Sequence, residues 1–118
     1  MGERSAQLLI VEDEEALAAC IALTLIEHGF NVLRVAKSVS DALRVLDAVK
    51  PDAALLDYRL ADSTSESLLR VLERRKVPIC VVTGTLRDEL PPAYANHRVL
   101  QKPFGEHELI EEVDRLLA

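Results

Sequence analysis

Side chains that can bind a cation or a phosphoryl group follow four short apolar runs of the sequence. They are Glu12 and Asp13 after QLLIV, Asp57 after AALL, Thr83 and Gly84 after VPICVV, and Lys102 after RVLQ. Carboxylates held close together repel one another unless they are protonated or share a cation. An all-oxygen site with room for water suits Mg²⁺ or Mn²⁺. A carboxylate can also attack phosphorus and form an aspartyl phosphate.

These residue types divide into a nucleophile, a metal site and an anion site. Asp57 is the better nucleophile, because it is the lone acid between a buried run and a polar loop. The pair Glu12 and Asp13 is better placed to hold a metal, although acidic capping of a following helix is an alternative role. Phosphoryl oxygens need a cation and hydrogen-bond donors. The candidates for that task are Lys102, the Thr83 hydroxyl and the backbone around Gly84.

Five short segments have the apolar pattern of strands, and helix-length segments separate most of them. The predicted strands are 7–11, 31–36, 53–56, 77–82 and 98–101, and the predicted helices are 14–27, 41–49, 66–75 and 107–117. The runs at 7–11 and 53–56 do not alternate with polar residues, which is typical of strands buried on both faces. Ser40 is the predicted N-cap of the second helix, and Gly29 supplies the position that ends the first.

The stretch 85–97 departs from this pattern. It contains adjacent prolines at positions 91 and 92. A proline inside a helix removes a hydrogen bond and clashes with the preceding turn. We therefore expect a fourth helix that is short or irregular, with one or two turns, or else a mobile segment.

The order of the elements predicts where the candidate side chains meet. Strands joined by helix-length connections form a parallel sheet with right-handed crossovers and helices on both faces. Ligands bind such sheets at the carboxyl ends of the strands, where the strand order reverses. Because every candidate side chain named above follows a strand, this topology brings them all to one edge of the sheet.

Composition excludes several classes of protein. The chain has 118 residues, a net charge of -6 and no Trp, so it lacks the basic and aromatic surface that nucleic acids or anionic membranes require. It has neither an apolar run long enough to span a bilayer nor a signal-peptide pattern. Cys20 and Cys80 are interpreted as buried thiols of a cytoplasmic protein. His28 suits the last turn of a helix, and His97 and His107 have no partner at ligand spacing.

The motifs LLIVEDE, LLDYRL, VVTG and QKPF, in this order, resemble those of response-regulator receiver domains. The likeness covers essentially the whole chain, so residues 1–118 are expected to form one receiver domain. The resemblance implies a flavodoxin-like (βα)5 fold, which is a doubly wound parallel five-stranded sheet with strand order 2-1-3-4-5. It also implies a cis peptide bond before Pro103.

By this resemblance Asp57 is the phosphoacceptor. The residues that match the phosphoryl contacts of the family are Thr83, Gly84 and Lys102. The donor would be a phosphohistidine on a sensor histidine kinase or a phosphotransfer protein, and water would later hydrolyse the phosphoryl bond. The chain would act as a signalling module rather than as an enzyme, by contact with a downstream protein partner. Whether it forms a homodimer stays open.

The same resemblance implies a Mg²⁺ site. The ligands would be the carboxylates of Asp13 and Asp57 and the backbone carbonyl of Arg59. Glu12 would act through metal-bound water.

Two features depart from the usual receiver pattern. Val99 stands where an aromatic residue is expected three positions before the lysine, and the interval from Thr83 to Lys102 is short. Both features resemble the stand-alone receivers called FAT GUY regulators, although residues 81–86 read VVTGTL and lack the Phe and Tyr of that motif. The usual hydroxyl-to-aromatic switch therefore does not carry over, and the stretch 85–97 is the expected moving element. Tyr58 is a candidate for the mouth of the site.

Two other functions are weighed against this one. An enzyme of the haloacid-dehalogenase type also uses a Mg²⁺-bound aspartate nucleophile. It needs a second acid two residues after that nucleophile, where this chain has Arg59. A pseudo-receiver would be a folded interaction module without chemistry, and the intact set of acids argues against it.

Overall fold

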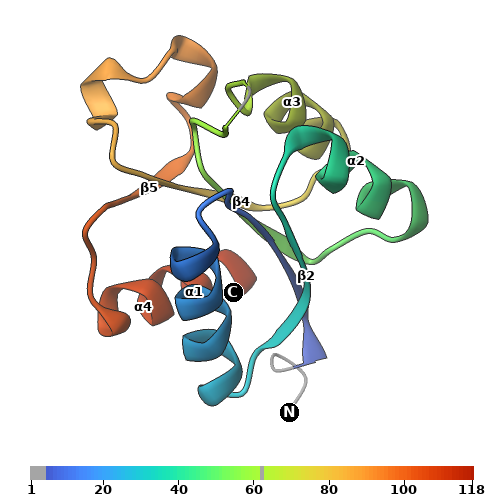
Figure 1. The fold of residues 1–118 in the computed structure, drawn as a ribbon, viewed down its shortest axis with the longest axis vertical. Helices are drawn as coiled ribbons and strands as arrows, with labels where there is room; N and C mark the ends of the chain where they lie inside the picture. Colours follow the sequence, from blue (N-terminus) through green and yellow to red (C-terminus); the bar gives the residue numbers. More distant parts are fainter. Residues whose placement is uncertain (1–4, 62) are drawn as a thin grey trace.

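The computed structural model describes residues 5–61 and 63–118, which Figure 1 shows as a ribbon. The strands are β1 (Gln7–Val11), β2 (Asn31–Ala36), β3 (Ala53–Leu56), β4 (Ile79–Thr83) and β5 (Arg98–Gln101). The α-helices are α1 (Glu15–Glu27), α2 (Val39–Ala48), α3 (Glu66–Arg74) and α4 (Glu106–Leu117). Two 3-10 helices, η2 (Arg87–Glu89) and η3 (Pro92–Tyr94), lie between β4 and β5. Within the described residues, no helix combines the length and the apolar composition of a membrane span.

All five strands are parallel and lie in the order β2-β1-β3-β4-β5. This is the doubly wound, flavodoxin-like order that the resemblance implied. The helices α1 and α4 cover one face of the sheet, and α2 and α3 cover the other (Figure 1). The strand order therefore reverses beside β1 and β3, whose carboxyl ends are the expected place for a ligand.

Apart from Gln7 at the start of β1 and Thr83 at the end of β4, the inner strands are apolar, because each face of the sheet has its own core. In β1, Leu9 and Val11 belong to the core beneath α2 and α3. Leu8 and Ile10 belong to the core beneath α1 and α4. Successive side chains of a strand point to opposite faces, so a strand covered on both faces has no polar positions to alternate with.

The N-cap of α2 is Ser38 and not Ser40, which corrects the prediction. The Ser38 hydroxyl accepts a hydrogen bond from the Asp41 N–H at 3.1 Å. An N-cap oxygen reaches an N–H two or three residues ahead, and Asp41 stands three residues after Ser38. Ser40 lies inside the helix, which spans Val39–Ala48.

The strand β4 begins two residues later than predicted and includes Thr83. The Val77 N–H donates to the Leu72 carbonyl at 3.0 Å and so closes the end of α3. Pro78 has no N–H with which to join the sheet. At the other end, Thr83 pairs in register with Gln101 of β5, which extends the strand to the edge where the site lies.

The segment 85–97 confirms the expectation of a short, irregular fourth helix. It contains only η2 and η3, each three residues long. Pro92 is the first residue of η3, a position that tolerates proline because its N–H would have no partner in the helix. Within 85–97, all of which the structure describes, Tyr94 is the only buried residue.

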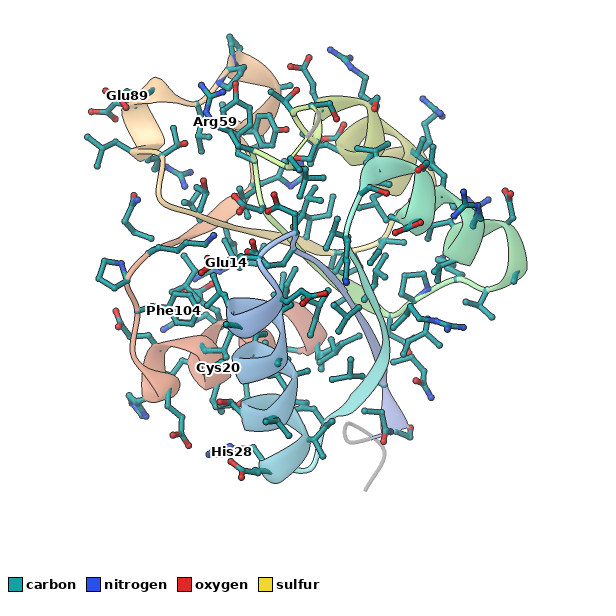
Figure 2. All side chains as sticks on the ribbon, in the orientation of Figure 1. Glu14, Cys20, His28, Arg59, Glu89 and Phe104 are labelled. Carbon is teal, nitrogen blue, oxygen red and sulfur yellow. The ribbon has the colours of Figure 1, made fainter. Side chains whose placement is uncertain are left out.

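The two cysteines differ in their surroundings. Cys80 is buried in β4, as predicted, and burial raises the pKa of its thiol to about 12. Cys20 is exposed on α1 (Figure 2), so the prediction of a buried thiol is wrong for this residue. Between Glu15 and Glu27, α1 carries no charged residue, and its sequence pattern therefore does not distinguish the covered side. The buried residues of α1 are Ala18, Ile21 and Leu25.

Candidate functional site

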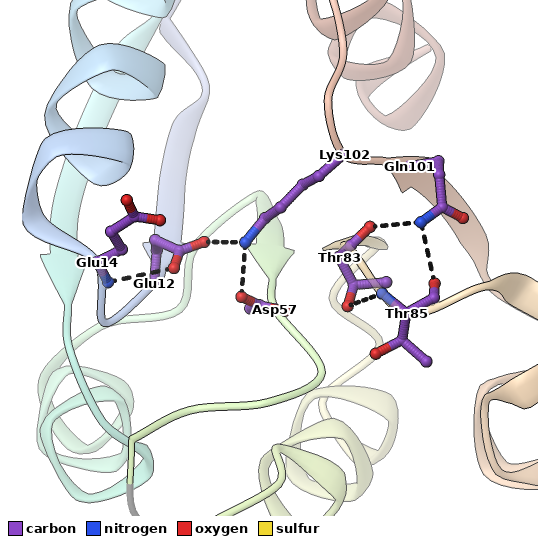
Figure 3. A network of polar contacts seen from close by, with 7 residues as sticks. All are labelled: Glu12, Glu14, Asp57, Thr83, Thr85, Gln101 and Lys102. Atoms are coloured by element: carbon purple, nitrogen blue, oxygen red, sulfur yellow. Dashed lines mark hydrogen bonds and ion pairs between the residues drawn. The ribbon is translucent and has the colours of Figure 1, made fainter.

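The strand ends bring four of the predicted side chains to one edge of the sheet (Figure 3). Glu12 follows β1, Asp57 follows β3, Thr83 ends β4 and Lys102 follows β5. Each of these strands is paired with a neighbour on at least one side. The sheet itself therefore sets the spacing of the four side chains.

Backbone hydrogen bonds continue past the strand ends and fix the positions of the site residues. The Asp57 N–H donates to the Val11 carbonyl at 3.1 Å, and the Lys102 N–H donates to the Thr83 carbonyl at 2.9 Å. The peptide bond between Lys102 and Pro103 is cis, as the resemblance implied. The functional side chains thus start from backbone that is held by rigid elements, as a preorganised site requires.

Lys102 pairs with two buried carboxylates. Its Nζ lies 3.1 Å from Glu12 Oε1 and 2.8 Å from Asp57 Oδ2. Glu12 and Asp57 are only 3% and 6% exposed. Desolvation disfavours a charged carboxylate unless an opposite charge or hydrogen bonds compensate it. The ammonium of Lys102 supplies that compensation to both acids.

Burial and the contacts between Glu12, Asp57 and Lys102 shift the pKa values of Glu12 and Lys102 in opposing ways. Burial raises the pKa of Glu12; the hydrogen bond from Lys102 counteracts this shift, and the charge of Asp57 adds to it. Burial by itself would lower the pKa of Lys102, but the hydrogen bonds to Asp57 and Glu12 outweigh it and raise that pKa. Lys102 therefore stays protonated at neutral pH. Its charge only partly offsets the effect of burial on Glu12, whose pKa stays raised.

Asp13 adds a third carboxylate to this pair. One oxygen each from Glu12, Asp13 and Asp57 lies within 4.8 Å of the others. When all three are ionised, one ammonium leaves two negative charges unbalanced. An all-oxygen donor set with that charge suits a hard divalent cation such as Mg²⁺. The residues present therefore fit the metal that the resemblance implied.

Thr83 belongs to a second group of contacts beside the first (Figure 3). Thr83 is 1% exposed, and its Oγ1 accepts a hydrogen bond from the Thr85 N–H at 3.2 Å. The Gln101 amide donates to the carbonyls of Thr83 and Thr85 at 3.0 and 3.2 Å. The structure places Thr83 at the predicted edge, with its hydroxyl oxygen engaged in the turn that follows β4.

Gly84 and Arg59 lie in the loops after β4 and β3. Gly84 is exposed, and a Cβ at this position would meet no heavy atom within 4 Å. The backbone of Arg59 forms an antiparallel bridge with Thr64, and its guanidinium carbon lies 5.2 Å from the centre of the Tyr58 ring. The Arg59 side chain thus contacts an aromatic face, while its backbone belongs to a closed loop beside Asp57.

Sequence reasoning missed a buried contact between Tyr94 and Ser65. The Tyr94 hydroxyl and Ser65 Oγ are 2.9 Å apart. The Tyr58 ring packs edge-on against the Tyr94 ring, with their centres 5.1 Å apart. Tyr58 is 9% exposed and therefore packs into the core rather than at the mouth of the site. The one signal for Tyr94 in the sequence is an aromatic residue inside a polar, proline-rich stretch.

A family model and curated relatives point to the same protein family. A family model described as the response regulator receiver domain matches residues 8–114. The transcriptional regulatory protein GlrR of Escherichia coli K12 is 27% identical over 122 residues, which cover 99% of this chain and 27% of GlrR. The transcriptional regulatory protein VxrB of Vibrio cholerae is 30% identical over 110 residues, which cover 90% of this chain and 44% of VxrB. The chain thus spans about a quarter of GlrR and less than half of VxrB.

Solved structures agree with this family. A putative response regulator from Chloroflexus aurantiacus superposes with a TM-score of 0.84 at 28% identity, and the match covers 96% of this chain and 98% of that one. A receiver domain protein from Methanospirillum hungatei gives 0.87 at 24% identity over 96% and 94% of the two chains. TrrA of Thermotoga maritima, solved in complex with Mg²⁺ and BeF, gives 0.84 at 20% identity over 94% and 98%. At these last two identities the likeness concerns the fold.

Proposed function

This chain belongs to the family of response-regulator receiver domains, and on that premise we propose that Asp57 accepts a phosphoryl group in a two-component phosphorelay. The observation that carries the proposal is the pairing of the buried Asp57 carboxylate with Lys102, inside a cluster of three acids. The proposed donor is a sensor histidine kinase or a phosphotransfer protein. Residues 1–118 would act as one receiver domain that signals to a downstream protein and is not an enzyme.

Asp57 is the proposed nucleophile. One of its carboxylate oxygens forms a bond to phosphorus while the bond from phosphorus to the donor's histidine nitrogen breaks, and the nitrogen keeps the electron pair. Lys102 Nζ lies 2.8 Å from the Asp57 carboxylate before transfer. It is therefore within reach of the oxygens of a phosphoryl group attached there, whose charge it would stabilise. Hydrolysis by water returns the carboxylate.

The acidic cluster is the proposed site of Mg²⁺, or of Mn²⁺ in its place. Asp13, Asp57 and the Arg59 carbonyl would be ligands, and Glu12 would act through a metal-bound water. The bound ion would offset the repulsion between the carboxylates and the incoming phosphoryl oxygens. Two observations support this proposal. The single positive charge of Lys102 is shared by two of the three acids and balances only one negative charge, and the structural neighbour TrrA was solved in complex with Mg²⁺ and BeF.

Thr83 and Gly84 are proposed to contact the phosphoryl group directly. A hydroxyl can accept one hydrogen bond and donate another. Since Thr83 Oγ1 accepts from the Thr85 N–H, its own proton is left to donate to a phosphoryl oxygen. The open side of Gly84 leaves space for a ligand to approach the backbone.

The experiment is an intact-mass measurement after incubation with Mg²⁺ and a small acyl phosphate. We expect the wild-type chain to gain one phosphoryl group and Asp57→Asn to gain none. The matched control is Asp52→Asn, because Asp52 lies just before β3, at the opposite end of the strand that Asp57 follows. Its carboxylate accepts a hydrogen bond from the Gln7 N–H at 2.7 Å. This variant should be phosphorylated like the wild type.

Two outcomes would contradict the proposal. A phosphoryl group on Asp57→Asn would mean that another residue is the acceptor. Failure of the wild type to accept phosphate from small donors and from a phosphohistidine protein would leave a phosphorylation-independent interaction module. Titration with Mg²⁺ separates the cases further, since such a module has no need of the metal.

A further inference from the structure

Tyr94 is the one buried side chain of an otherwise accessible segment. It lies at the end of η3 and is 1% exposed, whereas the other residues of 85–97 are exposed or half-buried. The ring belongs to the core beneath α2 and α3, in which Val99 also packs. Tyr94 therefore packs the segment between β4 and β5 against this core.

The hydroxyl of Tyr94 has a specific partner in the loop that follows β3. It lies 2.9 Å from Ser65 Oγ, and Ser65 is completely buried. Burial raises the pKa of Tyr94 to about 12, so the hydroxyl is protonated at neutral pH. Removing one partner of a buried hydrogen bond leaves the other unsatisfied, which is costly. The contact consequently favours one relative placement of the two segments.

The loop that Tyr94 contacts also carries the backbone beside the phosphoacceptor. Ser65 N–H donates to the Tyr58 carbonyl at 2.8 Å, and Leu60 N–H donates to the Ser63 carbonyl at 2.8 Å. Between these bonds, Arg59 forms its antiparallel bridge with Thr64. Tyr94 touches both ends of this closed loop, through the Tyr58 ring and the Ser65 hydroxyl.

We infer that Tyr94 is a positioning residue for the loop after β3: it holds residues 58–61 and 63–65, and with them the Arg59 carbonyl, in place against the segment 85–97. The metal part of this inference rests on the proposed function, in which that carbonyl is a Mg²⁺ ligand. Because coupling between two sites is reciprocal, an ion bound at Asp57 also orders the segment 85–97 through the same contact. Tyr94 thus links the site to the surface of the segment 85–97, to which a downstream protein can bind.

The test uses Tyr94→Phe, which keeps the ring and removes only the hydroxyl. In the metal-free chain, we expect the Leu60 and Ser65 amides to exchange hydrogen about 3- to 10-fold faster, the range for losing one neutral hydrogen bond. In a Mg²⁺ titration followed by NMR, the Kd should rise by about the same factor. Ser65→Ala should reproduce both effects. The double variant should show no faster exchange and no higher Kd than either single variant, because the two substitutions remove the same hydrogen bond.

His97→Gln is the matched control. His97 Nε2 lies 2.5 Å from Glu73 Oε2, so this contact ties the same segment to α3 and not to the loop after β3. The variant should leave the Kd for Mg²⁺ and the exchange of Leu60 and Ser65 unchanged. In the reciprocal measurement, Mg²⁺ should slow exchange at the Ala95 and His97 amides of the wild type and have less effect on them in Tyr94→Phe.

The inference is overturned if Tyr94→Phe leaves loop exchange unchanged, or if His97→Gln disturbs the loop equally. If the fold-changes in exchange rate or Kd of the single variants multiply in the double variant, the inference is also contradicted, because the two side chains would then act through independent contacts. The proposed function fails by a different result, a wild-type chain that neither binds Mg²⁺ nor gains a phosphoryl group. In that case the exchange rates of the metal-free chain still decide whether Tyr94 positions the loop.

Discussion

Glu12 is held in the site at the expense of stability. Burial is the main reason that its pKa lies above the usual value of 4.5. The hydrogen bond from Lys102 lowers the pKa but does not cancel this effect. A carboxyl group whose pKa is raised by folding contributes its full stability below pH 4.5 and loses it as the pH rises through the folded value. Above the folded value, and without a metal, the ionised Glu12 side chain therefore destabilises the folded chain.

We predict that Glu12→Gln stabilises the metal-free protein at pH 7 by about 1 kcal/mol, a typical gain for a single stabilising substitution. The amide removes the buried charge, and its oxygen can still accept from Lys102. The gain should shrink as the pH is lowered from 7 to 4.5, the ordinary value for a glutamate, because the wild-type carboxyl in the folded chain takes up its proton on the way. Thermal unfolding in the presence of a chelator, followed by circular dichroism at both pH values, measures this difference.

The control for that experiment is Glu14→Gln. The Glu14 side chain is exposed, although its N–H donates to Glu12 Oε2 at 3.2 Å. The unfolding temperature should stay the same in this variant at both pH values. A loss of stability in Glu12→Gln at pH 7 would show that the ionised carboxylate is net favourable and would contradict the predicted gain.

At the scale of elements, the start of α2 depends on one hydroxyl. Ser38 Oγ accepts from the Asp41 N–H, and Ser40 stands two residues later, inside the helix. We predict that Ser38→Ala lowers the free energy of unfolding by about 1 kcal/mol, the typical cost of losing an N-cap. Ser40→Ala should cost less, because the exposed Ser40 hydroxyl lies 3.2 Å from Ser38 Oγ but the Asp41 N–H keeps its partner. Urea unfolding midpoints of the two variants compare these values, and equal losses would contradict Ser38 as the cap.

The helix α1 illustrates what an element's sequence leaves open. Its apolar residues occur on all sides, so helical periodicity alone does not say which side is covered. The placement of α1 against the sheet exposes Cys20, Leu23 and Ile26. Cys20 was predicted to be buried for this reason, and the tertiary contacts decided otherwise.

At the scale of the whole molecule, the double-layered packing gives the two thiols different reactivity. Cys80 lies in the core beneath α1 and α4, with its pKa raised by burial to about 12. Cys20 is accessible. Since the thiolate is the reactive form, we predict that an aromatic disulfide reagent at mildly alkaline pH modifies one thiol of the native chain and both in denaturant. Cys20→Ser should abolish the native reaction, and modification of Cys80 in the folded chain would contradict the packing.

The sequence by itself determined the order of strands and helices, the edge at which the site forms and the residue types gathered there. It did so because the apolar runs of β1 and β3 have the length of strands and end abruptly at acidic residues, and because parallel strands align their carboxyl ends at one edge of the sheet. Glu12, Asp57 and Lys102 were therefore found from their positions after strands. The FAT GUY resemblance and the residue roles remain predictions, and the phosphorylation experiment tests the roles.

Only the tertiary structure decided which side chains meet across long separations in the chain. The approach of Tyr94 to Ser65, the covered side of α1 and the joint pairing of Lys102 with Glu12 and Asp57 depend on how the layers pack. Local pattern reflects the period of one element, whereas such contacts arise from the relative placement of two or three elements. That placement pairs buried polar groups of different elements, as the contact between Tyr94 and Ser65 shows, and no single segment contains the information for it.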